Sequence, residues 1–554
     1  MKKYLFLFLL FVSTTAHAST WYVTQAGSGS ANGTSYANSW SYAGITWGSV
    51  VAGDTMYLCD TFRQRTFAVG TSGYVGSPII IRGNYTGHAG IINGGNLITG
   101  FSLVSGSVYK VTYSPSSYRD YMFSEDVIPL TLIAWNTDEA TTVAAMTVGS
   151  YCYHGTTLYV RTRESDNPSG HSIENPTGVQ YDILLDLRGR SYLTVTNISI
   201  RNAFDYGFGA SASSGLLVDG ITADNIWDWG IYVENSPSPE TKNCVMKYCS
   251  RGGAPVFITG SGNIGEVIRY HNVTGGSIHN NDISKASSCG IDLTATTNGT
   301  SVYLNTIHDS DLAYEGAGGI YVDNGQNNLV YQNITYNCSN GAGLSVNSET
   351  DGTQSSGNKF YNNICYLNKG GIYLGNDFGS GHKRSSENFV YNNTFYGNGS
   401  YVDIHIAAGS QNETVENNIV FTLNALSGAS VIIDSGGETG LTMDYNLYYR
   451  DDGNLGLSYK GEWDWSLGLW QAHGLDAHGI NSNPNFVDAT NKNFRLTYGS
   501  PAVNKGVTLA SVTVDYEGTA RPQSTAYDIG AYESPYDTPG IIVSNLKISN
   551  LKVV

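Results

Sequence analysis

The chain has 554 residues, a formal net charge of -17 at pH 7 and a pI near 5.0, and only 14% of its residues are charged. This balance argues against nucleic-acid binding, which needs clustered Lys and Arg. The 40 tyrosines argue against global disorder. Abundant Gly, Asn, Ser, Thr and Tyr, without charged helical surfaces, favour an all-β protein with many tight turns.

The first residues have the features of a secretory signal peptide. Lys2 and Lys3 precede the apolar run 4–12, and residues 16–18 (Ala-His-Ala) place small residues at a cleavage site. We therefore expect a signal peptide over 1–18 and a secreted product, extracellular or periplasmic. No later stretch approaches the roughly 20 apolar residues of a membrane helix, so we expect an exported monomer that does not span a membrane.

Seven cysteines, an odd number, leave at least one thiol unpaired. No CxxC spacing occurs, which makes a zinc site improbable. Five of the seven fall within the repeat described next, where we expect them to act as small buried apolar side chains.

A repeat is the strongest feature of the sequence. From residue 191 onward, an alternating apolar strand, an Asn, a short turn and a Gly-Ile-x-aliphatic segment recur. The period of roughly 24 to 32 residues is in the range of solenoid proteins. Clear copies are 301–307 with 319–322, 329–334 with 343–346, 360–364 with 371–374, and 390–394 with 404–406.

The repeat predicts a right-handed parallel β-helix. Each short strand has the period-two pattern of a half-buried strand, and the dense leucines and helices of a leucine-rich repeat are absent. In coils stacked about 4.8 Å apart, aligned Asn amides would bond to one another and to backbone groups of the turns. We call this predicted stack the Asn ladder; its members are Asn281, Asn305, Asn333, Asn363, Asn393 and Asn418.

Changes in composition and in the repeat pattern divide the chain into segments. We predict the signal peptide (1–18), N-terminal coils and cap (19–95), a small inserted β-sandwich-like domain (96–182), the main β-helix with the functional face (183–430), C-terminal coils and cap (431–533) and a tail (534–554). Three tryptophans, Trp463, Trp465 and Trp470, stand in a polar loop after the repeat loosens.

Equivalent positions of a solenoid form rows along its surface. Alignment of the Gly-Ile-x-aliphatic segments gives one outward row with Tyr232, Phe257, Asp292, Tyr321, Ser345, Tyr373 and His405. The next outward row has Glu234, Thr259, Thr294, Asp323, Asn347 and Gly375, with Glu349 and Asp377 just beyond. Rings stack on pyranose faces and carboxylates bind hydroxyls. We therefore expect a polysaccharide or oligosaccharide ligand, with subsites lined by Tyr321, Asn347, Tyr373, Asp377, His405 and Glu234.

Three carboxylates on this face are catalytic candidates: Asp292, Asp323 and Glu349. Coils about 4.8 Å apart suit the roughly 5 to 5.5 Å carboxyl separation of retaining glycosidases, and a diagonal offset suits the roughly 6.5 to 9.5 Å of inverting ones. Like charges at such a distance raise one pKa and produce an acid and an ionised partner. The alternative is that these groups cap turns, bind calcium or are solvated.

Other chemistries have weaker signals. Asp309, Asp311 and Glu315 alternate in one loop and are candidate calcium ligands, with a solvated turn as the alternative. A lyase or uronate epimerase needs a base and a cation that neutralises the uronate carboxylate. The face is short of positive charge, although Lys285 and Arg269 keep this option open and calcium could substitute.

The sequence also resembles a known group. Residues 319–325 (Gly-Ile-Tyr-Val-Asp-Asn-Gly), followed by 345–349 (Ser-Val-Asn-Ser-Glu), resemble secreted right-handed β-helix proteins. Residues 149–162 are similar to the β-sandwich insertion of β-helix glycosidases, and 483–488 with 527–533 resemble their C-terminal cap. The β-helix β-xylosidases use an Asp nucleophile and a Glu acid/base about one coil apart. The resemblance implies these roles for Asp323 in the first quoted segment and Glu349 at the end of the second.

The sequence therefore predicts a secreted glycoside hydrolase that requires no cofactor, with calcium as the candidate cation. Asp323 would be the nucleophile, or the base of an inverting mechanism, Glu349 the general acid and Asp292 the alternate partner. Two alternatives remain: a polysaccharide lyase or uronate epimerase that uses calcium, and a non-catalytic surface solenoid that binds glycans. The epimerase motif Asp-Pro-His-Asp is absent.

Overall fold

The computed structural model describes residues 18–63, 66–114, 123–176, 183–250, 265–310, 318–349, 354–375, 385–399, 401–423 and 428–535. The predicted signal peptide, apart from residue 18, and the tail from residue 536 lie outside this set. Within it, no helix has the length and apolar character needed to cross a membrane.

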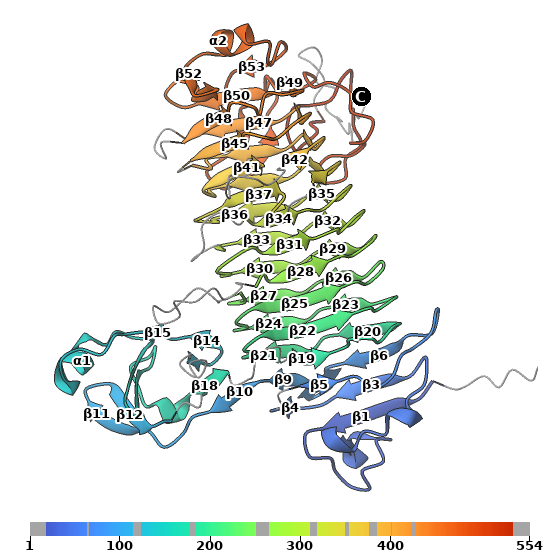
Figure 1. The fold of residues 1–554 in the computed structure, drawn as a ribbon, viewed down its shortest axis with the longest axis vertical. Helices are drawn as coiled ribbons and strands as arrows, with labels where there is room; N and C mark the ends of the chain where they lie inside the picture. The colour runs from blue at the N-terminus through green and yellow to red at the C-terminus, as the bar shows by residue number, and fades with distance from the viewer. Residues whose placement is uncertain are drawn as a thin grey trace, which may run out of the picture.

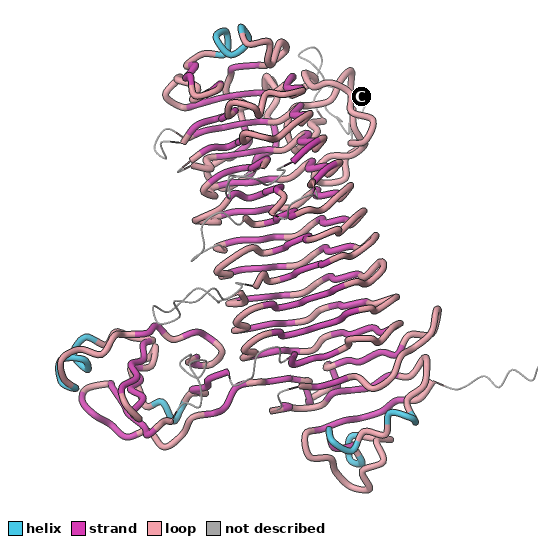
Figure 2. Tube along the Cα trace, viewed as in Figure 1, coloured by secondary structure: helices cyan, strands magenta, loops and turns pink. Residues whose placement is uncertain are grey.

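Three long parallel sheets form the body of the molecule (Figures 1 and 2). Sheet A has 14 strands, and sheets B and C have 13 each. From β20 (Leu193–Thr196) onward, most coils contribute one strand to A, then one to B and one to C. Each strand pairs with its equivalents one coil earlier and later, almost always in parallel. The chain is a right-handed parallel β-helix, as predicted from the repeat.

Sheet C carries the face of interest. Its strands, in order, are β5 (Phe67–Ala68), β19 (Ile183–Asp186), β22 (Tyr206–Ser211), β25 (Trp229–Glu234), β28 (Ile268–His271), β31 (Ile291–Thr294), β34 (Ile320–Asp323), β37 (Ala342–Asn347), β41 (Gly370–Leu374), β45 (Val402–Ile406), β48 (Ala429–Ile433), β51 (Leu457–Tyr459) and β52 (Glu462–Asp464). Sheet A extends from β2 (Trp40–Ser41) to β49 (Thr442–Asp444), and sheet B from β4 (Thr61–Phe62) to β53 (Ile480–Asn481).

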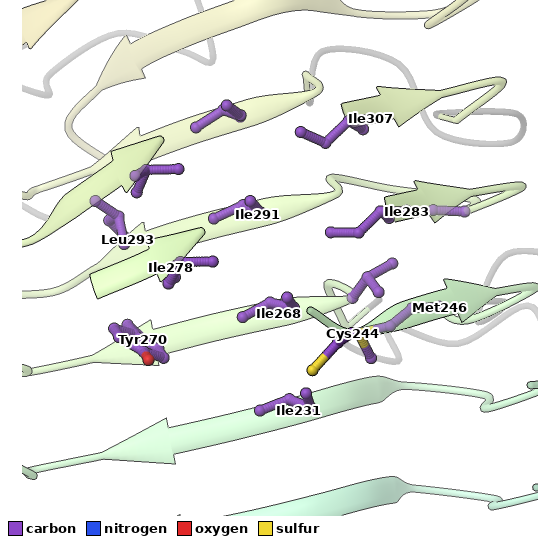
Figure 3. Close-up of a cluster of buried hydrophobic side chains, with 14 of the residues drawn as sticks. Ile231, Cys244, Met246, Ile268, Tyr270, Ile278, Ile283, Ile291, Leu293 and Ile307 are labelled. Carbon is purple, nitrogen blue, oxygen red and sulfur yellow. The ribbon is translucent and has the colours of Figure 1, made fainter. Parts of the chain in front are cut away.

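The core lies inside the coil and is continuous along it. Alternate residues of each strand point inward, so equivalent side chains stack from coil to coil (Figure 3). On sheet C, for example, Ile231, Ile268 and Ile291 are in register and fully buried. This stacking buries the aliphatic half of every strand and leaves the other half on the outer face.

The glycine that opens the Gly-Ile-x-aliphatic segment has a steric cause. A Cβ on Gly319 would lie 2.8 Å from the carbonyl oxygen of Gly343 in the next coil. A Cβ on Gly371 would meet the carbonyl of Asp403 in the same way. Because the neighbouring coil approaches so closely here, only glycine fits at the start of these strands.

The Asn ladder forms as predicted. Each side-chain amide from Asn281 to Asn393 donates through Nδ2 to Oδ1 of its equivalent one coil later, at 2.9 to 3.0 Å. The stack continues from Asn418 to Asn446 and ends on Asp476. Backbone groups bond to the same amides, so the turn between sheets A and B is satisfied without water.

Between β9 (Ile91–Asn93) and β19, the chain leaves the β-helix and forms two small, mainly antiparallel sheets beside its N-terminal part (Figure 1). One consists of β10 (Gly95–Leu97), β18 (Ile173–Pro176), β13 (Ser124–Glu125) and β14 (Ile128–Pro129). The other consists of β11 (Ser102–Ser105), β12 (Val108–Thr112), β17 (Thr157–Arg161), β16 (Ser150–His154) and β15 (Thr131–Leu132), with helix α1 (Glu139–Ala145) nearby. Separate apolar clusters hold these sheets together.

The C-terminal region does more than close the end of the coil. Helix α2 (Leu467–Ala472) places the fully buried Trp470 in the main core. The chain then returns along the outer face of sheet B, where the hairpin of β54 (Phe486–Asp488) and β55 (Asn493–Leu496) packs. Phe494, for instance, lies 4.9 Å from Tyr396 between ring centroids. The predicted C-terminal cap is therefore largely a lateral cover of sheet B.

All seven cysteines are free thiols and all are buried. Burial raises the pKa of the Cys244 thiol to about 12. The prediction of small buried apolar side chains within the repeat is confirmed.

Candidate functional site

The outward face of sheet C brings the predicted catalytic residues together. In register across successive strands lie Asp292, Tyr321, Ser345, Tyr373 and His405. We call this the outward row. Two residues further along the same strands, Asp323 is in register with Asn347. From β31 onward the two rows are those predicted by alignment of the repeat.

One coil earlier, the alignment was wrong. Phe257 and Thr259, which the repeat placed in the two rows, lie outside the described residues. The structure places Arg269 and His271 there, between Tyr232 and Glu234 of β25 and the strand β31. Both segments alternate apolar and other residues, and local periodicity alone does not choose between them.

Asp323 and Glu349 meet at the end of adjacent strands. Asp323 ends β34, and Glu349 follows β37 by two residues. The backbone N–H of Glu349 donates to Oδ1 of Asp323 at 2.9 Å and contacts Oδ1 of Asn324 at 3.1 Å. The Tyr321 hydroxyl donates to Oε1 of Glu349 at 2.8 Å. Two carboxyl groups and a phenol are thus held together by one strand and one turn.

Burial and charge shift the protonation of this group. Burial, with the charge of Glu349, raises the pKa of Asp323 to about 7. Burial raises the pKa of Asp292 well above its ordinary value, and the nearby Glu266 adds to the effect. Burial also raises the pKa of Tyr321, helped by the charges of Asp323 and Glu349. Near neutral pH the face therefore holds carboxyl groups that can still give up a proton, which general acid catalysis needs.

A half-buried cation, Arg269, lies at the N-terminal side of these carboxyls. Arg269 contacts Glu266 through Nη1 at 3.1 Å, and its Nε lies 3.8 Å from Oδ2 of Asp292. Its Nη2 donates to Thr294 at 3.3 Å. Burial alone would lower the pKa of Arg269, but Glu266 and Asp292 raise it, so the guanidinium stays charged. The sequence indicated Arg269 only as an option for a lyase, because its partners come from other positions of the repeat.

Aromatic side chains continue the face toward the N-terminus, and sequence reasoning missed most of them. Tyr206 and Trp229 are in register and stack at 4.6 Å between ring centroids. Tyr232 meets both rings edge-on. Trp229 also donates from Nε1 to Glu266 at 2.9 Å, which ties this group to Arg269. Strand alternation gave no signal for Tyr206 and Trp229, because they stand two residues from the inward-facing Phe208 and Ile231.

The other predicted ligand-binding residues lie on the same face at different distances from the carboxyl pair. Asn347 is buried beside Asp323. Tyr373 and His405 lie two and three strands beyond Tyr321 and meet edge-on at 5.8 Å between ring centroids. His405 bonds through Nε2 to Asp434 at 3.0 Å. Glu234 lies at the opposite end of the second row, and Asp377 is outside the described residues.

The predicted calcium loop is described only in part, because Asp311 and Glu315 lie outside the described residues. The Asp309 carboxylate accepts from Asn337 at 3.0 Å and lies 3.5 Å from Nζ of Lys285. His308 contacts its other oxygen at 3.0 Å. These groups already contact the Asp309 oxygens that would bind a cation. Calcium binding at this loop stays a prediction.

Among the described residues, clusters with metal-ligand spacing occur only in the small sheets, around His171. Its ring nitrogens already bond to Asp126 at 2.8 Å and Asp166 at 2.9 Å. The hydrogen bond to Asp126, with that to Asp166, raises the pKa of His171 to about 9. A protonated imidazole has no free electron pair for a metal.

Comparisons with known proteins agree with the architecture. The model of the right-handed β-helix region matches residues 132–307 and 305–461, which together are more than half of the chain. No curated protein matches the sequence. A structure of XylC in complex with xylose is 12% identical, with a TM-score of 0.51 over 93% of this chain and 98% of that one. Pectate lyase Pel9A is 11% identical, with a TM-score of 0.45 over 93% and 96%. A glycoside hydrolase is 9% identical, with a TM-score of 0.45 over 83% and 99%. Likeness at such identities concerns the fold alone.

Proposed function

Because the chain belongs to the right-handed β-helix family, we propose that the outer face of sheet C binds and cleaves carbohydrate. The reaction proposed is hydrolysis of a glycosidic bond in a polysaccharide or a derived oligosaccharide. The fold of the xylose-bound XylC, which spans almost the whole chain, supports a sugar ligand for this architecture. The chemistry of the face supports the same ligand, since carboxyls lie beside aromatic rings.

The observation that carries the proposal is the contact of Glu349 with Asp323 and Tyr321. Glycosidases use two carboxyls that flank the scissile bond, one protonated and one ionised. The acid gives its proton to the leaving oxygen as the C1–O bond breaks. The ionised partner either bonds to C1 or takes a proton from the attacking water. Asp292, next to Tyr321 in the outward row, is the alternate partner.

The raised pKa of Asp323 favours Asp323 as the proton donor in the free enzyme. Glu349, which accepts a hydrogen bond from the Tyr321 hydroxyl, would then act as the nucleophile or the base. The resemblance to β-xylosidases assigns the two roles in the opposite way. Rescue of Asp323→Ala and Glu349→Ala by azide separates the assignments, because the nucleophile variant of a retaining enzyme gives a glycosyl azide with inverted configuration.

A lyase is the second candidate, and Arg269 is the observation that favours it. A lyase removes the proton next to a uronate carboxylate, and a cation must neutralise that carboxylate. Arg269 supplies a charge on the right face. Its charge is however already shared with Glu266 and Asp292, which supports hydrolysis of a neutral sugar over elimination from a uronate.

A panel of neutral and uronate polysaccharides tests these functions. Hydrolysis releases reducing ends without ultraviolet absorbance, whereas elimination creates a conjugated double bond that absorbs. We expect new reducing ends from wild-type protein and none from Asp323→Asn or Glu349→Gln. Absorbing products would support the lyase, and full activity of both variants would refute the site.

We also propose that the protein is exported and monomeric. A mature N-terminus at residue 19 in the secreted protein would support export. Light scattering of the purified protein would test whether it is a monomer.

A further inference from the structure

The outward row does not end at His405. Register continues from His405 to Ile432 of β48 and from Ile432 to Ser458 of β51. Ser458 pairs with Trp463 of β52, the antiparallel strand that completes sheet C. Directly paired residues share a face of the sheet, so Trp463 lies in the outward row that begins with Asp292 and Tyr321. Figure 1 shows these strands as one column up to β52.

Trp463 forms a parallel pair with Trp465. Their ring centroids are 5.7 Å apart and their planes differ by 12°. The two side chains are 49% and 52% exposed, and Leu469 of α2 is 52% exposed. Each ring of the stack has one face that does not contact the other ring. About half of each side chain is open to solvent.

The contrast with Trp470 shows that this exposure is specific to the pair. Trp470 is fully buried in the main core and donates from Nε1 to Asp476 at 3.1 Å. Trp463 on β52 and Trp465 just after it could be buried only against another layer, and among the described residues nothing provides one. Adjacent exposed apolar side chains on a soluble protein commonly mark an interaction site.

The rings themselves and the charge of the chain specify the partner. Glu462 and Asp464 pair with Tyr459 and Leu457, so they lie on the opposite face of β52 from Trp463 and leave the rings as the exposed surface. Two parallel, half-exposed rings suit a pyranose, whose C–H face stacks on indole. The net charge of -17 disfavours a uronate polymer.

We propose that Trp463 and Trp465 form a glycan-binding platform that holds a distant segment of the polysaccharide acted on at Asp323 and Glu349. This inference rests on the proposed function. The platform lies six strands beyond Tyr321 in the same row, which corresponds to about 29 Å at the usual strand spacing. Tyr373 and His405 lie between the two ends. The bound ligand is therefore a linear, uncharged chain along the helix axis.

The proposal predicts a dependence on chain length. A short oligosaccharide reaches the carboxyl pair without touching the platform, whereas a long polymer engages both. Removal of the two indoles should weaken polymer binding about tenfold, since ring stacking and lost apolar contact together approach that factor. Turnover of short oligosaccharides should not change.

Affinity electrophoresis in gels with soluble arabinoxylan, mixed-linkage glucan, galactomannan or alginate tests the platform without requiring cleavage. The proteins compared are wild type, the Asp323→Asn variant and the Trp463→Ala/Trp465→Ala double variant. Leu469→Ala removes an equally exposed apolar group without a ring, and Tyr74→Ala removes an exposed ring (72%) far from β52. Trp463→Tyr keeps an aromatic ring at this position and should bind the polymer more tightly than the Trp463→Ala/Trp465→Ala double variant does.

We expect at least one neutral polymer to retard wild type, Asp323→Asn and both control variants equally, and to retard the double variant about tenfold less. Equal retardation of the double variant, retardation by alginate alone, or no retardation by any polymer would overturn the platform. If the double variant lost self-association of the protein and not glycan binding, the platform proposal would be overturned, and the pair would be a protein–protein contact. Binding by an inactive wild type would leave the platform standing while the hydrolase proposal fails.

Discussion

The backbone N–H of Glu349 donates a 2.9 Å hydrogen bond to Oδ1 of Asp323. Substitution Asp323→Asn removes the ionisable group and keeps an oxygen that can accept this bond, so the turn should keep its place. We expect a loss of activity between about 10²- and 10⁴-fold, the usual contribution of a general acid or base, with an unchanged Tm. Initial rates on the responsive polysaccharide measure this. Asp282→Asn, an exposed carboxylate on sheet B, is the control and should keep wild-type rates.

Arg269 should set the pH range of the reaction. Its charge lowers the pKa of Asp323, against the larger effects of burial and of Glu349. If Asp323 gives the proton, kcat/KM of wild type falls as the pH rises through about 7. Loss of the cation in Arg269→Gln raises the pKa of Asp323, and this fall should move to higher pH. Arg269→Lys keeps the charge and should leave the fall near its wild-type position. A shift of the Gln variant to lower pH would contradict the assignment.

One amide of the Asn ladder should account for a large share of the stability of its coil. Asn333 donates to Val302 and Asn363, and its Oδ1 accepts from the backbone and side chain of Asn305. Asn333→Ala leaves several buried groups unpaired, at about 1–3 kcal/mol each. We expect the free energy of unfolding to fall by about 3 kcal/mol or more in urea titrations. The exposed Asn491→Ala should stay within about 0.5 kcal/mol.

Buried carboxyls should make the fold more stable in mild acid than in mild base. Burial raises the pKa of Asp403 from 3.8 to about 7, although Thr422 and Asn398 donate to it. The folded state therefore keeps a proton that the unfolded state loses. The stabilising contribution is complete below pH 3.8 and is lost as the pH rises through about 7.

At 1.36 kcal/mol per pKa unit, this group contributes a decline of roughly 4 kcal/mol between these limits. Asp403→Asn cannot ionise and should flatten the decline of unfolding free energy between pH 5 and pH 8. A variant with the same pH dependence as wild type would show that Asp403 is ionised in the folded state.

The sequence predicted those features that repeat from coil to coil. The Asn ladder, the outward row from Asp292 to His405 and the buried cysteines follow from equivalent positions, because stacked coils give equivalent residues the same surroundings. The same reasoning failed where a coil is irregular. Between β25 and β31, two segments alternate equally well, and the alignment chose Phe257 over Arg269.

Other features depend on partners that no local pattern contains. Arg269 lies half-buried on the face because Glu266 and Asp292 offset its charge, and Asp292 belongs to the next coil. The return of the chain along sheet B depends on contacts such as that of Phe494 with Tyr396, nearly a hundred residues apart. Trp463 on β52 and Trp470 in α2 stand close together in the sequence, yet tertiary packing exposes the first and buries the second.

The seven buried thiols have a practical consequence. Because none forms a disulfide, maturation of this fold needs neither an oxidant nor an isomerase, whichever compartment receives the chain. A reductant has no bond to break, and burial keeps the thiolate, the reactive form, scarce. The protein should thus be produced in a reducing cytosol in the form that it has in an oxidising medium. Its cohesion comes from stacked aliphatic side chains and amides instead of covalent cross-links.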